Sequence, residues 1–322
     1  MNTAEIERQR NRLSRAYQLE SEYWLGRNGY MPDAELPSTL QYAAKLLEYQ
    51  FLPHYFGMPP SWRMLLRKFG GKRTLPDFCV VGPIKSGTSD LAVNILLHPN
   101  IIAPLAKEFY LPDPEDWRAF YPTEREKREH GLRYGPALSP FLAPYLHKMD
   151  LTYRLSQAKP DCKIVLTLRD PVKRVFSQWK WEVFLSSNKH AGELPFLSSF
   201  SAYVDKALAV FPEYPMYTAA GFDVLQTSIY WKAVSYWMEC FGRDNVLVLD
   251  VADYFADNNR FLGRIHEFVG LPAFQCPVST RINENPIALP PPDQESLSKL
   301  GEFFKPYNDK LWRVLGKEFD WR

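Results

Sequence analysis

The chain has 322 residues, of which 46% are hydrophobic and 24% charged, and its formal net charge is +2. This length and composition predict a globular protein with a well-buried core, in one large α/β domain or two small ones. The near-neutral charge argues against nucleic acid as a partner, so any anion-binding site should be local.

The first 70 residues differ from the rest of the chain. The pattern predicts an amphipathic helix over Glu5–Leu25 and a second helix over Ser38–Tyr55, which starts at a serine that can cap it. The basic, amphipathic stretch Trp62–Arg73 is expected to pack on its own domain, with contact to a membrane surface as the alternative. We therefore expect a helical N-terminal extension over 1–70 and a main domain over 71–322.

The cellular setting is predicted from the N-terminus and from the cysteines. The stretch MNTAEIERQRNRLSRAYQ is too polar for a signal peptide, and no apolar run is long enough to span a membrane. Cys79, Cys162, Cys240 and Cys276 are far apart and form no CxxC pair, so a zinc site is not expected. Cys79 and Cys162 fall in or beside apolar strands and are expected to be buried thiols. We expect a cytoplasmic protein in a reducing compartment.

From residue 75 onward, strands alternate with helices. The expected elements are a strand over 78–82, a helix over 90–97, a short strand within 98–104, loops and short helices over 111–150, a strand over 163–168, a helix through 186, an irregular segment over 187–222 with one helix near 200–210, a helix over 225–241, a strand over 245–250, a helix over 259–269 and a proline-led terminal helix pair over 290–316. This order predicts an α/β fold with a mostly parallel sheet that helices cover on both faces.

A first anion site is predicted in the loop Gly82–Ser89, between the first strand and its helix. Gly87 permits positive φ and close approach of the backbone, and the amides of 87–89 would point from a helix N-terminus toward an anion. Thr88 and Ser89 add hydroxyl groups, and Lys85 adds a positive charge. A loop that binds ATP would have a lysine after the glycine, where this chain has Thr88, so nucleotide triphosphates are disfavoured. Asp250 resembles a magnesium ligand only in that it ends a buried strand, and no metal is predicted.

A second anion site is predicted where the strand over 163–168 ends. Asp170 is a good N-cap and Pro171 occupies the favoured first helical position. Arg169 lies at the carboxyl end of a parallel strand, where α/β sheets bind ligands, and its guanidinium suits a phosphate. Ser177 follows about two turns into the helix, whereas Arg174 is expected to pair with a local carboxylate.

Together the two motifs resemble those of the PAPS-dependent sulfotransferases (PAPS is 3′-phosphoadenosine 5′-phosphosulfate). PIKSGTS over 83–89 is similar to the family's 5′-phosphosulfate loop, and RDPVKRVFS over 169–177 to its 3′-phosphate motif. The resemblance covers about residues 75–318 and implies a P-loop-like sheet, PAPS as donor and PAP as product. It implies that the donor is bound by Lys85, Ser86, Gly87, Thr88, Ser89, Arg169 and Ser177.

A further stretch, HPNIIAPLAKEFYLPD, resembles the region around the catalytic acid in the family's heparan-sulfate and carbohydrate branch. This alignment makes Glu108 the candidate base that takes the acceptor's proton, while Lys85 would neutralise the leaving oxygen. The alternative is that Glu108 only forms an ion pair or accepts from a backbone amide. His147 is a weaker alternative base, and His98 is expected to be a structural cap.

The acceptor side departs from that branch. Tyr110 stands where the branch often has histidine, and 135–140 lacks the branch's charged residues. The segments 111–150 and 187–222 are expected to line the acceptor pocket. Candidate acceptor-binding residues are Lys107, Tyr110, Tyr145, His147, Trp179 and Trp181.

We expect a small molecule or specialised metabolite as acceptor, as in natural-product sulfation by a soluble, bacterial-like enzyme. A carbohydrate chain is the alternative acceptor. A nucleotide-binding module without turnover is the alternative function, and a P-loop kinase is disfavoured. Oligomeric state is not predicted.

Overall fold

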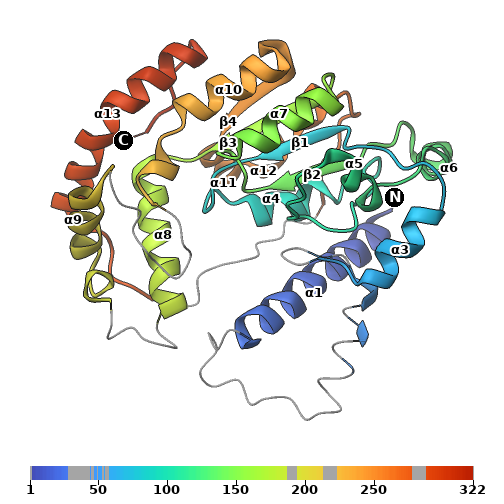
Figure 1. Cartoon of the computed structure of the whole chain (residues 1–322), viewed down its shortest axis with the longest axis horizontal. Helices are drawn as coiled ribbons and strands as arrows, with labels where there is room; N and C mark the ends of the chain where they lie inside the picture. Colours follow the sequence, from blue (N-terminus) through green and yellow to red (C-terminus); the bar gives the residue numbers. More distant parts are fainter. Residues whose placement is uncertain are drawn as a thin grey trace.

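The computed structural model describes residues 2–27, 44, 47–48, 50–52, 54, 58–186, 194–212, 223–277 and 288–321 (Figure 1). The side chains of 21–27 are outside this description. The helix expected over Ser38–Tyr55 lies mostly outside the described residues. Of the irregular segment 187–222, residues 187–193 and 213–222 lie outside them.

A four-stranded parallel sheet forms the centre of the molecule, in the order β2-β1-β3-β4. Its strands are β1 (Phe78–Val81), β2 (Pro140–Ala143), β3 (Lys163–Leu168) and β4 (Val246–Asp250). In the register, Phe78 lies opposite Pro140 on one side and Lys163 on the other. Strands of this kind are apolar on both faces, because helices cover both sides of a parallel sheet. The predicted α/β fold with a parallel sheet is confirmed.

Alternate residues of β1 enter two different cores. Cys79 and Val81 pack on the face covered by α7 (Met149–Ala158) and α10 (Trp231–Phe241). Phe78 and Val80 pack on the opposite face, with α4 (Thr88–Ile95) and α12 (Asn258–Val269). The period of two follows from strand geometry, since successive side chains point to opposite faces. Figure 1 shows the two helical layers on either side of the sheet.

A third core lies to one side of the sheet, among α8 (Pro171–Ser186), α9 (Phe200–Val210) and α13 (Gln294–Leu315) (Figure 1). Trp179 belongs to this core: its side chain is buried, and its indole N–H donates to the carbonyl of Leu197 at 3.2 Å. The expectation that Trp179 walls the acceptor pocket is therefore wrong.

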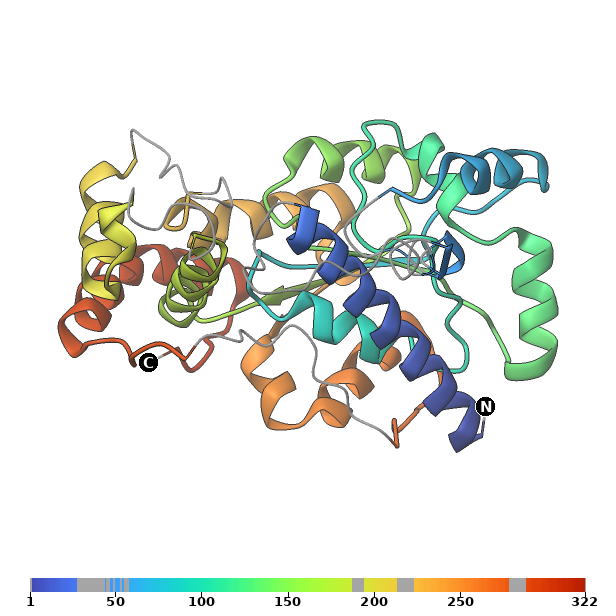
Figure 2. The ribbon, with the colours of Figure 1, turned by 90° about the horizontal axis from the view of Figure 1, so that it is seen from below.

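The N-terminal helix α1 (Thr3–Arg27) lies across α4, as Figure 2 shows from below. Ile6, Leu13, Ala16 and Leu19 are buried in the same core as Leu91 of α4. The remaining elements are α3 (Ser61–Phe69), α5 (Pro114–Trp117), η1 (Arg118–Phe120), α6 (Glu124–Tyr134), η3 (Pro195–Leu197), η4 (Gln226–Ser228), η5 (Arg243–Asn245) and α11 (Val251–Ala256). Among the helices that the structure describes, none is long and apolar enough to cross a membrane.

Three predicted elements differ from the structure. The strand expected within 98–104 is a turn, in which the amide of Ile101 donates to the carbonyl of His98, and the second strand is β2 instead. The helix expected over 225–241 is split into η4 and α10. The expected terminal helix pair is the single helix α13, which runs through Pro306. Proline removes one backbone hydrogen bond, and packing of α13 against α8, α9 and α10 offsets that loss.

Candidate active site

The loop that follows β1 presents backbone amides without a side-chain cap. Lys85 and Gly87 both have positive φ, at 69° and 72°. Gly87 is the N-cap of α4, and no side chain accepts a hydrogen bond from the first amides of this helix. These amides are therefore available to an anion, which the partial positive charge of a helix N-terminus also favours.

The loop is packed tightly against β3. A Cβ atom on Gly82 would lie 2.5 Å from Ser86 Oγ and 2.6 Å from Thr167 Oγ1, so only glycine fits there. Ser86 is buried, and its hydroxyl donates to the carbonyl of Pro83 at 2.7 Å. The side chain of Ser86, which the sequence assigns to the donor site, thus holds the shape of the loop.

Lys85 projects toward α8, where its Nζ lies 4.3 Å from the centre of the Trp181 ring. Burial, together with the nearby guanidinium groups of Arg169 and Arg174, lowers the pKa of Lys85 to about 8. An ammonium group in such a site gains more from an added anion than one in water does, because the surroundings screen it less. The structure therefore brings Lys85 together with Trp181, one of the predicted acceptor-binding residues.

Arg169 connects the second predicted anion site to the first. Its Nη1 donates to the backbone carbonyl of Lys85 at 2.7 Å. Its own carbonyl accepts from the hydroxyl of Tyr230 at 3.0 Å. Burial lowers the pKa of the guanidinium, which nevertheless stays charged at any ordinary pH. The two loops that follow β1 and β3 thus form one continuous cationic site.

The helix α8 begins as predicted, with Asp170 as its N-cap and Pro171 as its first residue. The carboxylate of Asp170 accepts from the amide of Val172 at 2.8 Å, and Pro171 is the first helical residue. Ser177 is partly buried on the same helix, two turns from its start.

The prediction that Arg174 pairs with a local carboxylate is wrong. This guanidinium is fully buried and donates to neutral groups: the carbonyl of Val224 and the hydroxyls of Thr227 and Ser228, at 2.7–3.1 Å. These partners come from the segment that carries η4, so Arg174 ties α8 to it.

Glu108 is linked to the first loop through its neighbour. Its carboxylate pairs with the ammonium of Lys107, and the side chains are 17% and 2% exposed respectively. The same ammonium lies 3.4 Å from Ser89 Oγ at the start of α4. The sequence alternative of an ion pair with Lys107 is therefore present, and that pair joins the candidate base to the helix whose amides face an anion.

Two tyrosines lie near Glu108. Tyr145 is partly buried, and burial together with the charge of Glu108 raises its pKa to about 12. The ring of Tyr110 makes an edge contact with Tyr145 at 6.1 Å between centres. The hydroxyl of Tyr110 donates to Asp150, and Lys148 Nζ lies 5.1 Å from its ring. Among the predicted acceptor-binding residues, Tyr110 is the one that solvent reaches most freely.

His147 lies beside Tyr230, with 6.4 Å between the ring centres. Burial lowers the pKa of His147 to about 4, so the ring is neutral near pH 7. Its Nε2 lies 3.2 Å from the carbonyl of Ile229, and the imidazole N–H there donates to that oxygen. This bond holds the side chain against the segment before α10.

Asp250 and His98 have structural partners. The carboxylate of Asp250 caps α11 through the amide of Ala252 and accepts from the indole of Trp321 at 2.7 Å. His98 accepts from the amide of Asn100 at 3.1 Å, as expected of a structural cap. Within the described residues, no group of histidine, cysteine and acidic side chains could hold a metal ion.

Tyr230 is the residue of this site that the sequence did not single out. It is fully buried, supports the carbonyl of Arg169 and lies beside His147 at 6.4 Å between ring centres. Its position 61 residues after Arg169 leaves no local signal of this contact.

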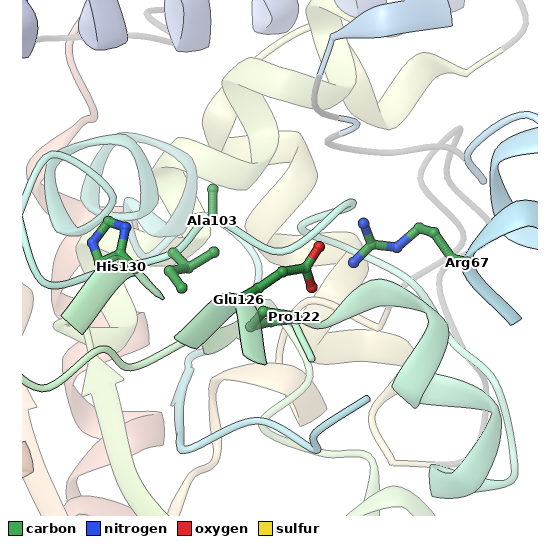
Figure 3. Close-up of a pocket in the computed structure, with 6 residues that line it drawn as sticks. Arg67, Ala103, Pro122, Glu126 and His130 are labelled. Carbon is green, nitrogen blue, oxygen red and sulfur yellow. The ribbon is translucent and has the colours of Figure 1, made fainter. Parts of the chain in front are cut away.

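A separate hollow of ≈ 250 Å³ lies between α3 and α6 (Figure 3). It is lined by Arg67, Ile102, Ala103, Pro122, Glu126 and His130. Arg67 donates there to the carbonyls of Ala119 and Tyr121, and Glu126 caps α6. These charged groups already have partners in the fold, and none of the lining residues belongs to the predicted site.

The sequence is similar to those of known sulfotransferases. The chain is 23% identical over 286 residues to human heparan sulfate glucosamine 3-O-sulfotransferase 3A1, covering 82% of this chain and 66% of the relative. It is 23% identical over 284 residues to human heparan sulfate glucosamine 3-O-sulfotransferase 6, covering 78% and 75%. The chain thus spans about two thirds to three quarters of these relatives.

The fold has a counterpart among solved structures. The crystal structure of a sulfotransferase from Alicyclobacillus acidocaldarius superposes with a TM-score of 0.51 at 20% identity, covering 76% of this chain and 98% of that one. The family model described as the sulfotransferase domain matches residues 75–285. The match covers both cationic loops and the Lys107–Glu108 pair, and the chain belongs to the sulfotransferase domain family, as its resemblance to the heparan-sulfate and carbohydrate branch implied.

Proposed function

We propose that the protein transfers a sulfuryl group from PAPS to a hydroxyl or amine of an acceptor. The observation that carries this proposal is the hydrogen bond from Arg169 to the carbonyl of Lys85, because it joins two anion sites on neighbouring strands. A nucleotide with phosphates on both sides of its ribose matches two such sites. PAPS supplies the sulfuryl group when bound.

The residues of this site fit such a donor. The uncapped amides at the start of α4, with Thr88 and Ser89, hold the 5′-phosphate, while Arg169 and Ser177 hold the 3′-phosphate. Lys85 neutralises negative charge that develops on the leaving oxygen. These groups are fixed before any ligand arrives, which lowers the cost of orienting the reaction.

Glu108 takes the proton of the acceptor hydroxyl or amine. Its carboxylate is only partly buried, so an acceptor can reach it from solvent. Lys107 holds one of its oxygens and leaves the other available to accept a proton. His147 is less suited to this role, since one ring nitrogen is engaged with the carbonyl of Ile229.

The acceptor that we propose is a small molecule, bound near Tyr110, Tyr145 and Trp181. The support is that Trp181 lies against Lys85, and that Tyr145 lies near Glu108 and contacts Tyr110. A carbohydrate chain is the second candidate, because the relatives' names include heparan sulfate glucosamine. Assaying both acceptor classes with labelled PAPS separates these candidates.

The domain boundaries and the cellular location of the protein are also proposals. We propose residues 1–70 as an extension of a sulfotransferase domain over 71–322, with support from the family match that begins at residue 75. We propose a reducing, cytoplasmic location. The support is that Cys79 and Cys162 lie buried with their sulfur atoms 3.7 Å apart and not bonded as a disulfide.

The test of this function is calorimetric titration with PAP. The wild-type protein should bind PAP, and Lys85→Ala and Arg169→Ala should each lose most of that affinity. Lys206→Ala and Arg133→Ala remove exposed cations on α9 and α6 and should bind as the wild type does. A wild-type protein that fails to bind PAP overturns the proposal, whereas PAP binding without turnover on any acceptor favours a nucleotide-binding module.

A further inference from the structure

The helix α3 presents its apolar side chains to solvent. Trp62, Leu65, Leu66 and Phe69 are between 44% and 81% exposed. Their spacing of three and four residues places them in one stripe along a helix. A helix of a globular domain ordinarily turns such a stripe toward the core. In α3 the apolar stripe faces solvent instead.

The polar face of α3 is what fixes this orientation. Arg63 Nη1 donates to the carbonyls of Gln50 and Leu52 at 3.0 and 2.9 Å. Arg67, one turn later, donates to two carbonyls around η1. Because both guanidinium groups are bound inward, α3 cannot rotate to bury its stripe without breaking four hydrogen bonds to the backbone.

The stripe continues onto neighbouring residues. The ring of Phe51 lies 5.9 Å from that of Trp62, and its side chain is 63% exposed. Met58, just before the helix, is half exposed. We call Phe51, Met58, Trp62, Leu65, Leu66 and Phe69 the α3 patch. Contiguous apolar patches on a soluble protein mark interaction sites.

The segment that carries the α3 patch has charges of one sign along the sequence. Between Glu48 and Asp77 the sequence has no acidic residue. The same stretch holds five cations, which are Arg63, Arg67, Lys68, Lys72 and Arg73. Lys68 and Lys72 are exposed beside the patch. Arg63, Arg67 and Arg73 donate to backbone carbonyls, so Lys68 and Lys72 are the cations that this segment presents to solvent. An apolar surface beside exposed lysines is complementary to an anionic lipid surface, where aromatic and leucine side chains enter the headgroup boundary.

We propose that the α3 patch docks the protein onto an anionic membrane surface. A second copy of this chain fits less well, because a symmetric contact would bring two surfaces with the same exposed lysines together. The patch lies at the far end of the molecule from α8, as Figures 1 and 2 both show. Docking through α3 therefore does not cover α8, the helix that carries Trp181.

Sedimentation with lipid vesicles tests this proposal. The full chain should bind vesicles of phosphatidylcholine and phosphatidylserine, and bind pure phosphatidylcholine vesicles far less. Leu66→Glu/Phe69→Glu should lower partitioning by more than about tenfold, since it removes apolar contact and adds negative charge. Lys68→Gln and Lys72→Gln should each lower it by about fivefold on the anionic vesicles.

The matched control is Leu132→Glu on α6, which changes an exposed leucine outside the patch and should bind as the wild type does. Equal thermal unfolding of all variants shows that folding is intact. Failure of the wild type to bind anionic vesicles overturns the proposal, and so does unchanged binding by Leu66→Glu/Phe69→Glu. A wild-type dimer in solution that this double variant separates, without vesicle binding, would identify a second copy as the occupant instead.

Discussion

The guanidinium of Arg169 donates to the backbone carbonyl of Lys85 at 2.7 Å. This bond reaches from the end of β3 to the loop after β1, at the one non-glycine residue with positive φ among those described. Arg169 therefore has two roles: it stabilises an unfavourable backbone conformation and adds a positive charge to the site.

The dual role of Arg169 predicts how its variants behave. Arg169→Lys keeps the charge but cannot hold the Lys85 carbonyl and bind a phosphate through two N–H groups at once. We expect it to weaken PAP binding by about tenfold, and Arg169→Ala to weaken it by about a hundredfold or more. Calorimetry measures both, with Arg133→Ala as the control. Equal affinity of Arg169→Lys and the wild type would show that only charge matters.

The pKa of Lys85 predicts a pH dependence. Its pKa is lowered to about 8 by burial and by neighbouring cations, so the side chain loses its charge as the pH rises through this value. Anion binding needs the protonated form, and kcat/KM for PAPS should therefore fall above about pH 8. The pH profile of initial rates measures this limb.

Two variants locate the titrating group. Lys85→Arg keeps its charge and should move the limb beyond the measurable range. Arg169→Ala removes a repelling cation and should move it to higher pH. A limb that stays in place in Lys85→Arg would assign the titration to another group.

Much of the fold was predictable because its signals are local. The run KIVLTL and the sequence Asp170-Pro171 predicted β3 and the start of α8, since an apolar run and an N-cap act on neighbouring residues. The strand β2 was missed because it begins at Pro140, in a segment rich in proline and tyrosine. Its position at the edge of the sheet, beside β1 alone, accommodates that proline.

Residues of the candidate site could be named from the sequence only where they belong to a recognisable motif. The sequence named Lys85, Arg169 and Glu108 as candidates, and the structure places them on connected loops, while their roles remain predictions. The partners of Arg174 and the role of Tyr230 were not found, because those contacts join residues more than 50 positions apart. Such contacts depend on how the helices pack, which no local pattern specifies.

The contact between Gly82 and its neighbours predicts a loss of stability. In Gly82→Ala the new methyl group would lie 2.5 Å from Ser86 Oγ and 2.6 Å from Thr167 Oγ1. Both neighbours are buried, so the loop must shift, and we expect a loss of about 1–3 kcal/mol in the free energy of unfolding. Urea unfolding measures it. Gly263→Ala on α12 is the matched control, because its Cβ would meet nothing and alanine favours a helix. Equal stability of the two variants would contradict the close packing of this loop.

The proposed role of Glu108 makes two linked predictions. Glu108→Gln should lower kcat by about 10²–10⁴-fold, because the amide cannot accept the acceptor's proton. PAP binding should change little, since the donor contacts come from other residues. The pKa of Tyr145, raised to about 12 by burial and by the charge of Glu108, should fall in this variant, because a neutral neighbour no longer disfavours the phenolate.

Ultraviolet difference titration against Tyr145→Phe isolates that tyrosine from the others. It reports the charge of Glu108 without depending on the acceptor, whereas initial rates with labelled PAPS report catalysis. Glu115→Gln, which changes an exposed carboxylate on α5, should leave both measurements unchanged. A Glu108→Gln protein with wild-type kcat but a lowered Tyr145 pKa would place the carboxylate correctly and deny it the role of base. His147, whose ring is neutral near pH 7, would then be the next candidate base.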